Sequence, residues 1–573
     1  MARLQNQKLL QTVLADYQAS KRWRQGGWDQ KAEEFYSLYR SQQEERGEST
    51  RHLSNLNIPY TFQVIETVVP RLVGARPEIK AQPREESDAE KAQYVGEMFS
   101  YAWELERLND ELEKVVRDAL MYGTGFARCS WDKELGLPTF ISVDPADAYP
   151  DITATCDRDL QYFIHEYDMT ADDLISTGKY DDVVIKKLKA IESKKINERL
   201  VNSQRAMSAS LANTDTAVTD TNTKINIKEW WTKDRVVAVA EGEKIIRDEE
   251  NPWGFIPFVS MRDYLVPHEY YGIGEVEHIR SLQHEANSLR NQIMDNLKSI
   301  VHRMWKRRRA GGVNKNTLVT KAGGVIDVND INDIVPLDTQ AIPSQAFEMD
   351  QIIKNNIQAT TSVTDFQIGT STDSLNDTAT GVTLIQEAGN QRFRMKIRHL
   401  EDFINDIGNK MLYGLQKWMP AKKVVRIIGQ DAAPVFKTIS RADIQGRFDI
   451  VIEAGSTQPV DRITERRNLV DILNLSQTPV IEPYVNIPEL YKRVLIKYNI
   501  KDPENILKQP QEASGVEQMM TQMSPEEIDA QLAQMDPKEA QMIRDEMGRL
   551  LQDQQPESMS QPAQAAPGGQ VAR

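Results

Sequence analysis

The sequence contains few cysteines and no uninterrupted stretch of eighteen apolar residues. Its 573 residues include only Cys129 and Cys156, too few for a disulfide framework or a four-ligand zinc site. We therefore predict two ordinary buried thiols. The missing apolar stretch argues against a membrane-spanning helix. The charged N-terminus also lacks the apolar core of a secretory signal, so we expect folding in a cytoplasm.

Motifs for catalysis and metal binding are also missing or incomplete. The Gly178-Lys179 pair resembles the end of a nucleotide-binding loop, but Asp173 and Tyr180 occupy positions that the motif reserves for other residues. The stretch YGIGEVE, residues 271 to 277, lacks the third glycine of a dinucleotide fingerprint. The seven histidines include no pair four residues apart. The sequence therefore predicts no enzyme, no cofactor and no metal.

Composition describes a large, acidic, globular protein. Hydrophobic residues make up 40% and charged residues 27%, and the chain is longer than one hydrophobic core normally serves. With 70 basic and 85 acidic residues, the formal charge is 70 − 85 = −15. This balance argues against tight wrapping of nucleic acid, because affinity for DNA rises with the number of neutralised phosphates. It remains compatible with a protein through which DNA must slide.

The stretch MYGTGFARCSWD, residues 121 to 132, joins two periodic patterns. Apolar residues recur at steps of three and four from Leu105 to Tyr122, which predicts a helix that ends at Gly123. Residues after the glycines alternate between apolar and polar, which predicts a strand. A phosphate-binding loop requires the opposite order, because only the N-terminal end of a helix offers free N–H groups. We interpret Gly123 as the left-handed residue that ends the helix.

Patterns elsewhere in the first half indicate helices, an insertion and strands. Residues 1 to about 50 are strongly charged with aromatic anchors, and we expect an outer helical layer. Residues 203 to 224 contain almost no large apolar side chain, which is typical of a flexible insertion. The alternation from INIKEWW to NPWGFIPFV predicts a small region of antiparallel strands.

Two long helical patterns enclose a compact excursion and a polar loop. Apolar spacing from Ile279 to Met304 predicts a helix of about thirty residues. Residues 303 to 344 predict two or three short strands, and residues 345 to 361 a returning helix. Residues 362 to 379 form a polar loop, and the stripe from Ile397 to Trp418 predicts a second long helix. The polar face predicted for the first helix comprises His284, Asn287, Arg290, Asn291 and Lys298.

The C-terminal region changes composition. From about residue 509 it is rich in Gln and Met, and Ser524 and Asp536 each begin a pattern typical of a helix start. Two short helices are therefore predicted before a tail, residues 561 to 573, whose Pro, Gly and Ala content favours disorder.

Five motifs in this order resemble those of bacteriophage portal proteins, the head-to-tail connectors, of the short-tailed phage type. RDALMYGTGFARCSWD is similar to the helix-to-strand corner of the family, VDPADAYPD to the turn that follows, and NPWGFIPFV to the turn before the stem. GIGEVEHIRSLQHEANSLRNQIMDNL is similar to the first stem helix, and TATGVTLIQEAGNQRFRMKIRHLEDF to the long helix after the tunnel loop. The resemblance covers roughly residues 50 to 455.

The resemblance implies an α+β, mostly helical fold that assembles as a ring, usually of twelve subunits, around a central channel. It assigns residues 1–270, with the flexible insertion 203–224, and 380–455 to the wing. The stem helices would be 271–302 and 345–361, the clip 303–344, the tunnel loop 362–379 and the crown 456–512. Residues 513–573 would form a helical extension and a disordered tail.

The partners implied by the resemblance are those of a capsid vertex. The ring would assemble with capsid and scaffolding proteins in the host cytoplasm and remain in the virion. Double-stranded DNA would enter through it, driven by a separate terminase ATPase, and would leave through it after a tail adaptor binds. No membrane is implied. The acidic balance fits a channel that lets DNA pass without holding it.

Two segments would then carry the contacts. The tunnel-loop residues expected to face DNA are Asp365, Phe366, Gln367, Thr370, Ser371, Asp373, Asn376 and Asp377. The clip residues expected to bind terminase or adaptor are Arg303, Lys306, Arg307, Arg308, Arg309, Lys315 and Lys321. Simpler interpretations remain open for both segments. The loop could merely join two helices, and the cations could merely complement a helix C-terminus.

Two other functions also remain open. A scaffold or tail adaptor would explain the helices and the acidity, but not the order of helix, excursion and helix. A cytoplasmic enzyme with an unrecognised site would explain size and composition, but no catalytic constellation supports it.

Overall fold

A computed structural model describes most of the first 452 residues. The described ranges are 2–43, 53–74, 76–77, 79–187, 224–301, 304–309, 330–337, 342–363, 379–428 and 434–452, with short pieces at 48, 328, 470–473, 490–491 and 494–495. The chain divides into two compact units, Met1–Pro459 and Val460–Arg573. The insertion predicted at 203–224 lies outside the described residues except for Lys224, which begins a strand, and almost all of the predicted crown and both predicted C-terminal helices also lie outside them. No described helix has the length and apolar character needed to cross a membrane.

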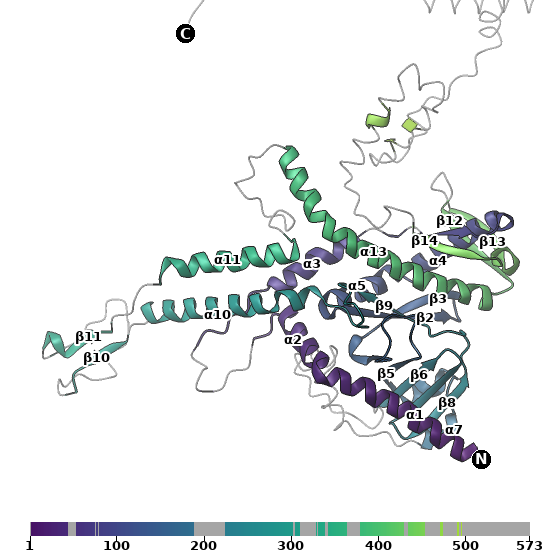
Figure 1. The fold of residues 1–573 in the computed structure, drawn as a ribbon, viewed down its shortest axis with the longest axis horizontal. Coiled ribbons are helices and arrows are strands. Elements are labelled where there is room, and N and C mark those ends of the chain that lie inside the picture. Colours follow the sequence, from purple (N-terminus) through teal and green to yellow (C-terminus); the bar gives the residue numbers. More distant parts are fainter. Residues whose placement is uncertain are drawn as a thin grey trace, which may run out of the picture. The chain divides into compact units, whose positions relative to one another are not determined.

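The first unit mixes helices with antiparallel sheets, which agrees with the predicted α+β class (Figure 1). Its α-helices are α1 (Ala2–Trp23), α2 (Asp29–Tyr39), α3 (Tyr60–Val73), α4 (Ala89–Leu105), α5 (Leu108–Tyr122), α6 (Ala171–Ser176), α7 (Asp182–Lys187), α10 (Glu275–Val301), α11 (Ser344–Thr361) and α13 (Ala379–Trp418). A π-helical turn, η1 (Arg24–Trp28), joins α1 to α2, so the helices expected in the first fifty residues are present.

The strands form five sheets, in which every described pairing is antiparallel. The largest has the order β4-β5-β6-β7-β8, and a second has the order β3-β2-β9. Their strands are β2 (Thr124–Asp132), β3 (Leu137–Val143), β4 (Ala148–Pro150), β5 (Tyr162–Thr170), β6 (Lys224–Thr232), β7 (Arg235–Ala240), β8 (Lys244–Glu250) and β9 (Phe258–Arg262). Two-stranded sheets pair β1 (Ile79–Pro83) with β14 (Phe448–Ile452), β10 (Trp305–Arg307) with β11 (Ile334–Pro336), and β12 (Lys422–Ile428) with β13 (Pro434–Ser440).

The predicted strand region after residue 224 is correct in its strands but incomplete in its grouping. β6, β7 and β8 form the expected meander, but β5 extends it on the other side through a nine-residue register with β6. β9 leaves this sheet and pairs with β2 instead. Local alternation predicts a strand, whereas its partner depends on contacts between distant residues, which alternation does not contain.

The corner predicted at Gly123 is confirmed. Gly123 ends α5 with φ +87°, and its N–H donates to the carbonyl of Ala119 at 2.8 Å. A Cβ atom on Gly123 would lie 2.1 Å from the backbone oxygen of Gly272, so glycine is also required by the close approach of a second chain segment. Leu105, predicted to begin this helix, is instead the exposed last residue of α4, because Arg107 breaks the helix with φ +51°.

The cysteines differ from the expectation in one case. Both are unpaired, but only Cys129 is buried, in strand β2, and burial raises the pKa of its thiol to about 12. Cys156 is half-buried and donates its S–H to the carboxylate of Asp159 at 3.2 Å. The prediction of buried thiols is therefore wrong for Cys156, which lies in a turn between β4 and β5 rather than in a strand.

One hydrophobic core connects α3, α4, α5 and the β3-β2-β9 sheet with the first turns of α10 and the second half of α13. Aromatic rings contribute much of it, and Phe163 of β5 stacks on Phe258 of β9 with ring centroids 4.0 Å apart. Because β5 and β9 belong to different sheets, this stacking fastens the two larger sheets together. The core therefore fixes the base from which α10 starts.

Candidate functional site

Helices α10 and α11 pair along their length, and the β10-β11 sheet lies at their far end (Figure 1). Ile353 and Ile357 of α11 are buried in the core together with Ile279 of α10. The guanidinium of Arg290 on α10 also binds the carboxylate of Asp350 on α11 at 2.7 Å. We call α10 and α11 the helix pair. Its length follows from its periodic apolar residues, since twenty-seven residues of α10 span about 40 Å.

The first helix of the pair ends earlier than the sequence predicts. α10 stops at Val301, so Met304 lies beyond it and is exposed. The backbone carbonyl of Met304 accepts the N–H of Leu337 at 2.8 Å and so extends the β10-β11 ladder. Apolar spacing alone could not locate this end, because Met304 continues the helical period while its backbone already belongs to the hairpin.

An extended segment, residues 53–59, lies along α10 and is held by side chains four residues apart on the helix. We call it the strap. The N–H groups of Ser54, Leu56 and Ile58 donate to the side-chain oxygens of Asp295, Asn291 and Asn287 at 2.6, 2.6 and 2.9 Å. Just after the strap, the N–H of Thr61 in α3 donates to the side-chain oxygen of Gln283 at 3.3 Å. Four helical residues advance about 6.0 Å and two extended residues about 6.6 Å, so the two spacings match.

The strap contacts part of the polar face predicted for α10. Asn287 and Asn291 were predicted to lie on the polar face of the helix, and their amides bind backbone groups of the strap. Asn291 accepts from the N–H of Leu56 and also donates to the carbonyl of Leu56 at 3.1 Å. Burial opposes the charged form of Asp295, yet hydrogen bonds from Ser54 hold its pKa below the usual value. Amide and acid side chains at a strict four-residue spacing were the signal in the sequence that could have indicated a bound segment.

A second contact attaches the helix pair to the N-terminal helices. The carboxylate of Glu34 on α2 binds Arg280 at 2.6 Å and His284 at 2.7 Å, both on α10. Burial would raise the pKa of Glu34, but the hydrogen bonds from His284 and Arg280 lower it below its ordinary value. Of the predicted polar face, Arg290 contacts α11, His284 contacts α2, and Lys298 pairs with Asp295 at 3.5 Å.

Residues 304–309 and 330–337 form what we call the terminal hairpin. Trp305, Lys306 and Arg307 pair with Pro336, Val335 and Ile334. A capping box between Asp330 and Asp333 orders the turn before β11, and the N–H of Arg308 donates to the carbonyl of Asp333 at 3.0 Å. Ile331 is 87% exposed, and Trp305 and Val335 are also exposed. The hairpin therefore presents apolar and basic groups together.

Four of the predicted basic residues lie in this hairpin. Lys306, Arg308 and Arg309 are exposed and Arg307 is half-buried. They occupy β10 and the residues after it, well beyond the end of α10, so the interpretation as cations that complement a helix C-terminus is wrong for them; that effect falls off within the last turn. Arg303, Lys315 and Lys321 lie outside the described residues.

The predicted polar loop falls almost entirely outside the described residues. This applies to all eight of its proposed DNA-facing residues, from Asp365 to Asp377. Its first residues are described, and Val363 is buried in the core rather than part of a solvent-exposed loop. The two flanks are joined directly, because Arg392 of α13 donates to the backbone oxygens of Thr360 and Ala359 at the end of α11, at 2.7 and 3.2 Å.

The glycine motifs take structural places. Gly178 has φ +61° and follows the end of α6, so its neighbour Lys179 does not stand at the start of a helix as in a phosphate-binding loop. Gly272 and Gly274 approach the α5 corner closely: Cβ atoms there would lie 2.7 Å from the oxygen of Gly123 and 2.5 Å from that of Leu120. Packing of backbone against backbone accounts for these glycines.

Comparison with known protein families adds one finding. Residues 135–541 match the family model described as Phage SU10 portal protein. The match covers well over half of the 573 residues, including the helix pair, the terminal hairpin and α13.

Proposed function

Because the chain belongs to the phage portal protein family, a family of structural virion proteins, we propose that its copies form a ring at one capsid vertex through which double-stranded DNA is packaged and later ejected. The family match over residues 135–541 is the observation that carries this proposal. We take the ring to contain twelve copies, assembled in the host cytoplasm with capsid and scaffolding proteins.

Exposed apolar side chains on the helix pair support a ring. Leu297 and Val301 of α10 and Phe347, Met349 and Ile352 of α11 are 41–59% exposed. Large apolar side chains left exposed on a pair of long helices are available to pack against another protein. A head-to-tail arrangement of identical chains around a closed ring would cover such surface on every copy.

Within this proposal, the helix pair forms the stem and the terminal hairpin forms part of the clip. The stem takes residues 271–302 and 345–361, and the clip 303–344. The wing takes 1–270 and 380–455, the tunnel loop 362–379 and the crown 456–512. The exposed basic residues of the hairpin suit an acidic surface of terminase during packaging, and of a tail adaptor afterwards. The formal charge of −15 per chain suits a bore that holds DNA weakly.

Electron microscopy of the purified chain tests the ring directly. Rings with a central channel are the expected result. Rods would favour the scaffold alternative, and compact monomers would favour a different protein class. A phosphate-release assay on the same sample tests whether the packaging motor is a separate protein. Turnover that disappears in Lys179→Ala would contradict that part of the proposal.

The DNA path has its own test in the segment 362–379, whose sequence contains Asp373 and Asp377 and no Lys or Arg. If this segment lines the bore, Asp373→Lys with Asp377→Lys should slow packaging at low salt and recover partly at higher salt, because added phosphate contacts are screened. An equal charge change within residues 203–224 is the control and should be nearly silent. Equal effects at both places would remove the segment from the DNA path.

A further inference from the structure

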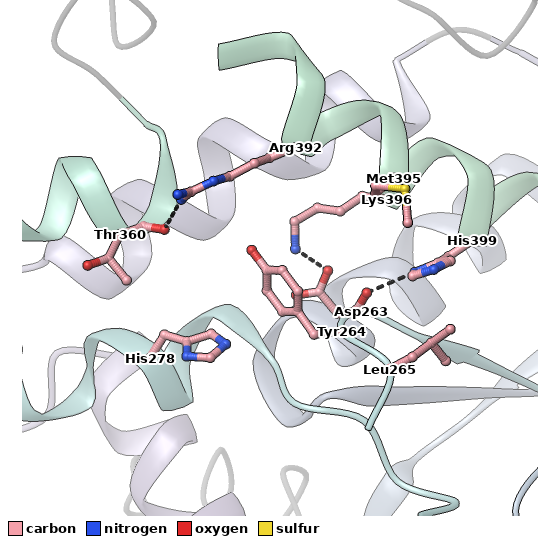
Figure 2. A pocket seen from close by; sticks show the side chains of 9 residues that line it. All are labelled: Asp263, Tyr264, Leu265, His278, Thr360, Arg392, Met395, Lys396 and His399. Carbon is pink, nitrogen blue, oxygen red and sulfur yellow. Dashed lines mark hydrogen bonds and ion pairs between the residues drawn. The ribbon is translucent and has the colours of Figure 1, made fainter. Parts of the chain in front are cut away.

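A cavity of about 540 Å³ lies at the base of the helix pair (Figure 2). Four parts of the chain line it: the segment 263–265 after β9, the first turns of α10, the last turn of α11, and α13. The two helices that flank residues 364–378 therefore meet here with the strand that leads into the helix pair. The side chains at this cavity therefore contact four parts of the chain at once.

Three of those side chains form a buried charged group, which we call the basal cluster: Asp263, Glu275 and Lys396. They are 2%, 1% and 4% exposed. The ammonium of Lys396 contacts the Oδ1 atom of Asp263 and lies 2.9 Å from Oε1 of Glu275. It also lies 3.8 Å from the ring centroid of Tyr264, whose hydroxyl donates to Oε1 of Glu275 at 3.0 Å. The cluster thus joins the 263–265 segment, α10 and α13.

The charges of the basal cluster do not balance when both carboxyl groups are ionised. One ammonium then faces two carboxylates, and the site carries an excess negative charge away from water, which is strongly unfavourable. The second oxygen of each carboxyl group, Oδ2 of Asp263 and Oε2 of Glu275, is buried without a hydrogen-bond donor among the described residues. A single bound proton would remove the excess charge.

Other charged or titratable groups at the cavity do not supply this balance. The imidazole of His399 contacts the backbone oxygen of Asp263 at 2.9 Å rather than its carboxylate. Arg392 is engaged with the carbonyls at the end of α11. His278 contacts the ring of Tyr264 edge-on, with centroids 5.1 Å apart. In α11, the cavity lining is the uncharged Thr360.

We propose that the basal cluster is a proton-operated tie, in which one proton held by the carboxyl group of Asp263, beside the carboxylate of Glu275, keeps the segment before α10 fastened to α13. When the proton leaves, the excess charge draws water into the adjoining cavity and the tie loosens. The device goes beyond the proposed passage of DNA, and it acts in a single chain whether or not a ring forms.

The direction of the pH dependence follows from burial. Burial raises the pKa of Asp263 to about 7 and the charge of Glu275 adds to the rise, although Lys396 opposes it. A carboxyl group with a raised pKa holds its proton more tightly in the closed state than in the open one. The tie is therefore complete at pH values below the ordinary carboxyl pKa of about 4, weakens as pH rises from there to about 7, and changes little above it.

Hydrogen–deuterium exchange of the full-length protein between pH 5 and pH 8 tests the tie, after correction for the intrinsic pH dependence of exchange. The local opening constant of peptides covering 263–280 and 392–400 should rise about tenfold per pH unit up to about pH 7. Glu275→Gln leaves one carboxylate for one ammonium, so this rise should disappear. If that variant does not fold, Asp263→Asn also leaves one carboxyl group beside the ammonium of Lys396, and the rise should again disappear.

The matched control is Glu66→Gln, which alters a carboxylate paired with Arg117 at 3.1 Å and hydrogen-bonded to Tyr39 in a different part of the chain. This variant should keep the wild-type pH profile in the two peptides. A wild-type opening constant that stays flat across the range would overturn the proposal. So would a Glu275→Gln profile as steep as that of the wild type. Rings seen by electron microscopy alongside either result would leave the proposed function standing.

Discussion

Gly123 should be far less replaceable than another glycine of similar backbone conformation. Gly123 and Gly178 both have positive φ, +87° and +61°. A Cβ atom on Gly178 would meet nothing within 4 Å, whereas one on Gly123 would lie 2.1 Å from the oxygen of Gly272 and 2.6 Å from its carbonyl carbon. Gly178→Ala should therefore destabilise the protein only through the left-handed conformation of the new alanine, by about 1 kcal/mol. An alanine at Gly123 must also push away the segment that leads into α10.

The size of the additional loss follows from the hydrogen bonds around the corner. The N–H of Asp263 donates to the carbonyl of Gly123 at 3.1 Å, and the N–H of Gly272 donates to Oγ1 of Thr124 at 2.9 Å. A shift of the 263–274 segment breaks both, at about 1 kcal/mol each. We therefore expect Gly123→Ala to lower the free energy of unfolding by roughly 3–4 kcal/mol, against about 1 kcal/mol for Gly178→Ala.

Urea unfolding of the full chain, followed by circular dichroism, measures both losses under the same conditions. The difference between the variants is the informative quantity, because both carry the same added methyl group. If Gly123→Ala lowers the free energy of unfolding by no more than Gly178→Ala does, the corner accommodates a methyl group without further loss of stability. The close approach of Gly123 and Gly272 would then not be a constraint on the fold.

Three further changes separate the roles of the other contacts. Asn291→Ala removes both hydrogen bonds between Asn291 and the strap, so it should lower the free energy of unfolding by about 1–3 kcal/mol and speed proteolysis at 53–59. The control is Gln292→Ala at the exposed neighbouring residue, which should change neither quantity. Lys396→Met leaves two buried carboxyl groups without their cation, and calorimetry should show that the free energy of unfolding falls by about 3–5 kcal/mol. A melting temperature equal to that of the wild type would contradict the buried pairing. Arg307→Glu with Arg308→Glu should preserve rings in micrographs but abolish packaging or tail attachment, and normal virion yield would remove the terminal hairpin as the docking surface.

The sequence predicts those elements whose cause is local. The α5 corner and α10 were predictable because apolar residues recur along a single helix face and a glycine ends α5. The end of α10 was not, since Met304 continues the apolar period while its carbonyl pairs with Leu337. The pairing of β9 with β2 could not be predicted from the local sequence pattern either, because residues 124 and 262 meet only in the folded chain.

The candidate site was predictable only in part for the same reason. Basic residues at 306–309 stand out in the sequence, and four of them do lie in the terminal hairpin. The strap was missed because a polar helix face ordinarily indicates solvent, whereas here amides on that face replace water for an extended backbone. The basal cluster was missed because Asp263, Glu275 and Lys396 come from three separate elements, and single charged residues carry no periodic signal.

The segment 263–275 couples the two contacts that fix the base of the helix pair. On one side its Gly272 meets Gly123 with no room for a side chain, which sets the position of α10 against the α5 corner. On the other side its Asp263 and Glu275 share Lys396 of α13. The glycine contact is rigid because backbone meets backbone, whereas the charged contact depends on a proton. A loosening of the basal cluster should therefore move α13 relative to α10 while the corner holds α10 in place.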